Sequence, residues 1–210
     1  MPTPIDFHCY LISDRTHTGG RPLVSALLAA AQAGIRAVQI REKDLSPREL
    51  FALANETRLA LAPLGTRVLL NDRADIACAA RLAGVQLPSA GLSPASARCC
   101  LPTGALVGAS THTLVEARYA EAFGADFLTF GPVFATPSKA AYGEPRGLEE
   151  LRAVCAAVKI PVFALGGVTP ARVPACLAAG AHGVAAISAL LDVPNIADAV
   201  HAFADALGGL

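Results

Sequence analysis

The chain of 210 residues contains no tryptophan, a single methionine and only 5% aromatic residues. Proteins that bind single-stranded nucleic acids stack the bases on aromatic side chains, so this scarcity argues against such a partner. Basic and acidic residues number 17 each, which leaves no net charge to attract a nucleic acid or an anionic membrane. We therefore expect any anion to be bound by a local cluster of cations.

Long apolar segments and metal-binding cysteine patterns are missing as well. No apolar run approaches the about 20 residues of a membrane span, and no basic segment followed by an apolar one opens the sequence. We therefore expect a cytoplasmic protein without a membrane partner. The six cysteines form no Cys-x-x-Cys pair and have no histidine-rich neighbour, so we interpret them as buried apolar residues rather than zinc ligands.

Hydrophobic residues make up 53% of the sequence, and short β-rich runs recur about every 20 to 25 residues. Each run is followed by an Ala- and Leu-rich stretch of helical period, which predicts parallel βα units. Strands are predicted at 10–13, 37–41, 68–71, 84–87, 106–110, 127–131, 162–166 and 183–188. Because there are eight units and no Gly-x-Gly-x-x-Gly follows the first, we predict an α/β protein, a (β/α)8 TIM barrel forming a single domain over 1–210, rather than a doubly wound sheet.

In such a barrel the ligand-binding residues follow the carboxyl ends of the strands. The second strand ends with Gln39, Arg41 and Lys43, a set that suits a pyrophosphate because Arg offers a planar fork and Lys a compact charge. The alternative is a solvated charge run over residues 41–44. We expect Glu42 and Asp44 to face solvent rather than to bind a metal.

The third strand ends at Asn71 and Asp72. Mg2+ usually binds one or two carboxylates together with phosphate oxygens, so Asp72 is a candidate metal ligand and Asn71 a phosphate donor. The alternative role for Asp72 is to cap the next helix. Asp75 is interpreted as a first-turn helix residue.

Hydroxyls and glycines follow the later strands. Ser110 or Thr111 is expected to cap the helix after the fifth strand and to offer an anion its free N–H groups, while His112 is expected at the surface. The loop 131–143 carries Thr136, Ser138 and Lys139 and is interpreted as an anion-binding lid, with a plain linker as the alternative. Gly167 after the seventh strand and the helix start after the eighth predict a phosphate cup.

Seven ordered motifs resemble the thiamine phosphate synthase and TenI family over nearly the whole chain. They are YLISD at 10–14, VQIREK at 38–43, LNDR at 70–73, GASTH at 108–112, FGPVF at 130–134, TPSK at 136–139 and ALGG at 164–167. The resemblance implies a synthase that joins aminomethylpyrimidine pyrophosphate to thiazole phosphate and releases pyrophosphate with the help of Mg2+. The expected partners are these phosphorylated small molecules, and a homo-oligomer is a candidate assembly of the chain.

The resemblance also implies roles for individual residues. The catalytic set would be Arg41, Lys43, Ser110 and Lys139. Substrates would be bound by Gln39, Asn71, Thr136, Ser138, Gly167, Ile187 and Ser188, the last three holding the thiazole phosphate. Asp72 would hold the Mg2+.

The sequence departs from the synthase pattern after the fourth strand. Synthases there read roughly Gly-Val-His-Leu-Gly-Gln-x-Asp, whereas this chain has Gln86 at the His and Gly91 at the Asp, the second metal ligand. The sequence there resembles TenI proteins, which include thiazole tautomerases, yet the acid/base His expected of those is Pro132 in this chain. We therefore favour synthase chemistry. A TenI-type tautomerase and a non-catalytic regulatory barrel that binds thiazole phosphate are the alternatives.

Overall fold

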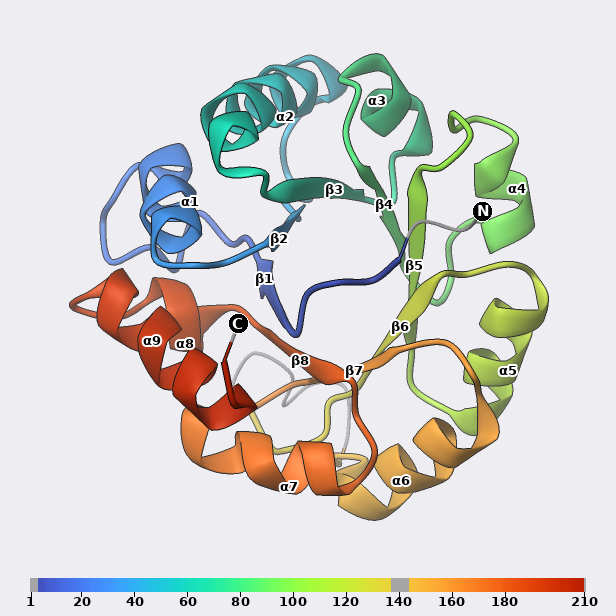
Figure 1. The fold of residues 1–210 in the computed structure, drawn as a ribbon. Coiled ribbons are helices and arrows are strands. Elements are labelled where there is room, and N and C mark those ends of the chain that lie inside the picture. The colour runs from blue at the N-terminus through green and yellow to red at the C-terminus, as the bar shows by residue number, and fades with distance from the viewer. Residues whose placement is uncertain (1–3, 137–143, 210) are drawn as a thin grey trace.

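The computed structural model describes residues 4–136 and 144–209. Eight parallel strands pair in chain order, and β8 pairs with β1 to close the sheet into a barrel (Figure 1). The strands are β1 (Cys9–Ile12), β2 (Ala37–Ile40), β3 (Arg67–Asn71), β4 (Gly84–Leu87), β5 (Leu106–Thr111), β6 (Phe127–Phe130), β7 (Val162–Leu165) and β8 (Gly183–Ala186). The predicted (β/α)8 fold is confirmed.

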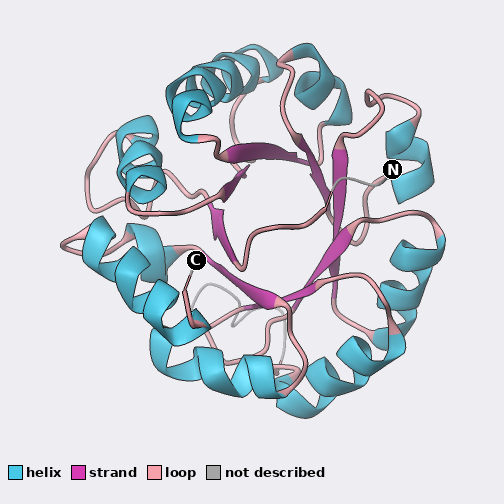
Figure 2. Cartoon of the chain, viewed as in Figure 1, coloured by secondary structure: helices cyan, strands magenta, loops and turns pink. Residues whose placement is uncertain are grey.

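Helices surround this barrel on its outside (Figure 2). They are α1 (Leu23–Gln32), α2 (Pro47–Leu61), α3 (Ala74–Ala79), α4 (Pro94–Arg98), α5 (Leu114–Ala122), α6 (Gly147–Ala157), α7 (Val173–Ala178), α8 (Ser188–Leu191) and α9 (Ile196–Leu207), with 3-10 turns η1 (Ala62–Leu64) and η3 (Pro170–Arg172). The longest, α2, begins at a capping box in which Ser46 and Glu49 bind each other's backbone N–H. Among the described residues, no helix is long and apolar enough to cross a membrane.

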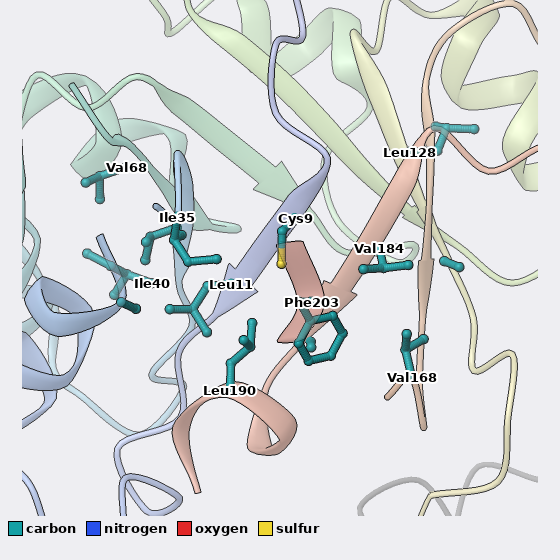
Figure 3. Packing of buried hydrophobic residues seen from close by; sticks show 14 of the residues in the cluster. Cys9, Leu11, Ile35, Ile40, Val68, Leu128, Val168, Val184, Leu190 and Phe203 are labelled. Carbon is teal, nitrogen blue, oxygen red and sulfur yellow. The ribbon is translucent and has the colours of Figure 1, made fainter. Parts of the chain in front are cut away.

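The larger core lies between the strands and the helices. Outward-facing residues such as Leu11 and Val184 pack against helix residues such as Leu190 and Phe203, all four fully buried (Figure 3). Cys9 and Cys176 belong to this core, and burial raises the pKa of the Cys9 thiol to about 12. The expectation that every cysteine is buried is wrong, because Cys78 on α3 and Cys99 and Cys100 in the turn after α4 are exposed.

A second core fills the inside of the barrel near the amino ends of the strands. Phe7, just before β1, has its ring centroid 5.1 Å from that of Phe163 and 5.8 Å from that of Phe127. Tyr10 packs edge-on against Phe127 at 5.6 Å. These rings fill the barrel at the amino ends of the strands, so a ligand must enter from the carboxyl end.

Candidate active site

Polar side chains replace the apolar interior at the carboxyl ends of five adjacent strands. Ala37, Leu69 and Phe127 line the apolar interior, and the residue two positions further along each of these strands is polar. Because side chains alternate across a strand, residues two apart share a face, and these polar groups also point inward. They are Gln39, Asn71, Gln86, Ser110 and Thr129. The other side of the mouth is apolar and is formed by Ile12, Leu165 and Ile187.

The end of β2 is organised by a buried carboxylate. Glu42 is 7% exposed and accepts hydrogen bonds from the Ser13 hydroxyl and from the Arg15 backbone N–H and guanidinium. Ser13 in turn accepts the backbone N–H of Arg41 at 2.9 Å. The expectation that Glu42 faces solvent is therefore wrong, because the partners that hold it come from the loop after β1.

Arg41 and Lys43 are left available to a ligand by the same arrangement. Asp44 binds both terminal nitrogens of Arg15, and these hydrogen bonds lower the pKa of the Asp44 carboxyl. Both acids of the run thus pair with Arg15, and no ion pair within residues 4–136 and 144–209 involves Arg41 or Lys43. The run does not neutralise itself, so Arg41 and Lys43 keep their charges without a carboxylate partner among the described residues.

A sharp turn at the end of β3 presents Asp72. Its φ of 67° lies in the left-handed region, which Asp tolerates better than most residues. Asp72 does not cap α3, since Arg73 occupies that position without a side-chain cap. Asp75 is in the first turn, as predicted, where it binds the Arg73 guanidinium. The Asp72 carboxylate thus has no capping function.

The loop after β4 brings Gly91 to the side of Asp72. A Cβ placed on Gly91 would lie 3.2 Å from Asp72 Oδ1, so this is where a second carboxylate would stand. Within the described part of the chain, no three His, Cys, Asp or Glu side chains are grouped to hold a metal ion. Asp72 is thus the carboxylate that the described residues offer at this point, and one carboxylate fits a Mg2+ site whose other ligands are phosphate oxygens and water.

On β5, Ser110 is half-buried and lines a cavity of about 400 Å³ between the β4–α4 loop and α5. The expectation that Ser110 or Thr111 caps α5 is wrong, because the cap is Thr113, which accepts the Glu116 N–H. His112 is not a surface residue as expected. It is half-buried and its Nδ1 bonds the Gly131 carbonyl.

The loop after β6 is described only as far as residue 136, where Thr136 is half-buried. Ser138 and Lys139 lie outside the described residues. The expected lid function of this loop therefore stays a prediction. Pro132 packs against Gly166, whose φ is 96° and whose added Cβ would lie 2.6 Å from Pro132. The position of the tautomerase His therefore has no titratable group.

Backbone groups dominate the mouth at β7 and β8. Gly167 has a φ of 63°, and an added Cβ would lie 2.7 Å from the Ala135 carbonyl, so the close approach of the two loops requires glycine. Ile187 precedes α8 and Ser188 begins it. The first N–H groups of a helix lack intrahelical acceptors. This side can therefore bind a phosphate through backbone N–H groups.

Comparison with known proteins decides the family. Residues 9–190 match the thiamine monophosphate synthase family. The chain belongs to this family. A Geobacter sulfurreducens protein provisionally named thiamine-phosphate synthase is 51% identical over 91% of this chain and 90% of its own length, and thiamine-phosphate synthase of Moorella thermoacetica is 40% identical over 90% of each. A thiamine phosphate pyrophosphorylase structure from Pyrococcus furiosus is 31% identical, covers 96% of each chain and has a TM-score of 0.87.

In this thiamine monophosphate synthase family member, the described candidate residues all lie at the carboxyl end of the barrel. Sequence reasoning assigned no binding role to Gln86 or Thr129, and it missed the support that Ser13 and Glu42 give to Arg41. The sequence did carry a signal for Gln86 and Thr129. Each is a polar residue at an inward position of a strand whose other inward residues are apolar or glycine.

Proposed function

We propose that the chain is a cytoplasmic thiamine-phosphate synthase, a transferase that joins aminomethylpyrimidine pyrophosphate to thiazole phosphate within one barrel domain over residues 1–210. The observation that carries this proposal is the division of the mouth. Cations and polar side chains gather at β2 to β6, whereas glycine and helix-start N–H groups lie at β7 and β8. Two different anions, a pyrophosphate and a monophosphate, are thus accommodated on opposite sides.

The bond that breaks joins the pyrimidine methylene carbon to the pyrophosphate oxygen, and the electron pair leaves with pyrophosphate. Arg41 and Lys43 stabilise the charge that develops on this leaving group, an effect that is strongest where water is excluded. The thiazole nitrogen then donates its electron pair to the methylene carbon. The apolar side chains Ile12, Leu165 and Ile187 keep water from competing for that carbon.

Asp72 would hold Mg2+, which when bound supplies further positive charge to neutralise pyrophosphate. Asn71 and Ser110 would donate hydrogen bonds to the same group, and Gln39 would line the substrate pocket beside them. Thr136, Ser138 and Lys139 would contact the substrates from the loop after β6.

The alternatives are less well supported. A tautomerase needs an acid/base at the position of Pro132, and a pure binding protein has no use for a second anion site built from cations. The Moorella thermoacetica relative, 40% identical, carries the synthase name, and the Geobacter sulfurreducens relative, 51% identical, carries it provisionally.

The test is pyrophosphate release from the two substrates by the purified protein, with Mg2+ and with chelator. We expect metal-dependent release that falls about 100-fold in Arg41→Ala, since a charge-assisted contact to the leaving group is lost. Arg152→Ala is the matched control, because Arg152 is an exposed α6 residue paired with Glu149. No release by the wild-type protein, or equal losses in both variants, would refute the proposal.

A further inference from the structure

Side chains from three adjacent strands form a hydrogen-bonded cluster beneath the mouth. Gln86 Nε2 lies 3.1 Å from Ser110 Oγ and 3.3 Å from Thr129 Oγ1, and the Thr129 hydroxyl lies 3.3 Å from Ser110 Oγ. Gln86 is 0% exposed and Thr129 is 2% exposed. Ser110 is half-buried and stands near the carboxyl end of β5, next to the mouth. The cluster therefore reaches a ligand through Ser110.

The direction of each hydrogen bond follows from the chemistry of the groups. An amide nitrogen can only donate, so the two N–H bonds of Gln86 Nε2 point to the two hydroxyl oxygens. Thr129 then gives its own proton to Ser110. Ser110 Oγ has two lone pairs, and both accept hydrogen bonds from inside the barrel. Its own proton is left to point away from Gln86 and Thr129, toward the mouth of the barrel.

Gly108 determines which way the Gln86 amide is turned. A Cβ on Gly108 would lie 2.3 Å from Gln86 Oε1, so a Cα–H of this glycine points at that oxygen, which has no hydrogen-bond partner among the described residues. A Cα–H is a weak donor that suits an oxygen and repels an N–H. The opposite orientation would bury two N–H bonds there without an acceptor, at a higher cost.

We propose that Gln86 and Thr129 are positioning residues that fix Ser110 as a hydrogen-bond donor toward the substrate. Two bonds accepted from below also polarise the Ser110 hydroxyl and strengthen its outward bond. The group at this point must be an acceptor, and its identity as an anionic pyrophosphate oxygen rests on the proposed function. An ammonium or amino group placed here would face the Ser110 proton instead of a lone pair, so it would find no acceptor.

The experiment measures the Kd of inorganic pyrophosphate with Mg2+ by calorimetry, together with kcat, KM and melting temperature. Thr129→Val removes one donor and keeps the shape, whereas Thr129→Ser keeps the hydroxyl. We expect Thr129→Val to weaken pyrophosphate about fivefold, as loss of one supporting hydrogen bond implies, and Thr129→Ser to change it less than twofold. In a Ser110→Ala background, Thr129→Val should have no further effect.

Gln86→Glu tests the direction of the bonds. A carboxylate at this position is an acceptor, so it turns the Ser110 proton inward and weakens pyrophosphate binding more than tenfold while the protein stays folded. Unchanged binding in Gln86→Glu would overturn the inference, as would an equal effect of Thr129→Val with and without Ser110. If the wild-type protein binds and releases pyrophosphate but the effect of Thr129→Val does not depend on Ser110, this inference fails and the proposed function stands. If it does neither, both proposals fail.

Discussion

Gly91→Asp places a carboxylate where the family resemblance implies a second metal ligand, and the structure predicts that this single change is not enough. The new Cβ would lie 2.9 Å from two atoms of the Pro88 ring as well as 3.2 Å from Asp72 Oδ1. A proline ring cannot move aside as a flexible side chain does. We expect Gly91→Asp to lower the free energy of unfolding by about 2 kcal/mol through overpacking, with little gain in Mg2+ affinity.

Pro88→Gly together with Gly91→Asp removes the obstructing ring, and glycine is the residue that the synthase pattern has there. The added carboxylate can then reach the side of Asp72. We expect the Mg2+ concentration for half-maximal pyrophosphate release to fall about tenfold, since one further anionic ligand is worth about 1.4 kcal/mol. Pro88→Gly alone should leave that concentration unchanged.

Thermal melting and Mg2+ titrations of pyrophosphate release measure both effects. Gly91→Asn is the matched control, because it has the size of Asp without the charge and should lose stability without gaining metal affinity. In an Asp72→Asn background the double variant should gain nothing, as the two carboxylates act together. A stable Gly91→Asp protein that binds Mg2+ as tightly as the double variant would refute the reasoning about Pro88.

Three further outcomes are expected. Asp72→Asn should keep the stability of the wild type because Asn tolerates a φ of 67°, whereas Asp72→Ala should lower the free energy of unfolding by about 1 kcal/mol. Mg2+-dependent turnover should fall in both variants. Thermal melting measures the first effect and kinetics the second. Glu42→Ala should lower the free energy of unfolding by roughly 2 kcal/mol in denaturant titrations and reduce turnover, because Ser13 and Arg15 lose a buried partner, while Glu42→Gln should cost less. Burial, and then repulsion from His8, lowers the pKa of His182 below its ordinary 6.5. The unfolded chain therefore takes up a proton first as the pH falls through 6.5, so the melting temperature should fall from pH 7 to pH 5, and less so in His182→Gln.

The fold was predictable because its signals are periodic. Each strand is a short β-rich run followed by a helical stretch, and eight such units close a barrel. The bounds were less certain, since pairing with β8 adds Cys9 to β1 and pairing with β6 carries β5 on to Thr111. Such pairings depend on neighbouring strands and not on local sequence.

Side-chain partners were harder to predict than positions. Glu42 stands between Arg41 and Lys43 in the sequence and was expected in solvent, yet its carboxylate is buried by groups about 27 residues away. The cap of α5 was misplaced because several hydroxyls follow one another there, and only the backbone path selects Thr113. Sequence reasoning finds the strand that carries a group, whereas the partner of that group depends on the neighbouring strand.

Residues on the strands and residues in the loops of the mouth differ in how easily they can be replaced. Gln86, Ser110 and Thr129 stand on paired strands with fixed register, so replacing any one of them leaves a buried polar partner without its hydrogen bond. Gly91 lies in a loop, where a carboxylate can be lost without disturbing the barrel. This difference explains how the chain can keep the strand-borne polar groups for pyrophosphate and lack a second loop-borne ligand for the metal. If so, more of the coordination of Mg2+ comes from the pyrophosphate itself, and the metal and this substrate bind as one unit.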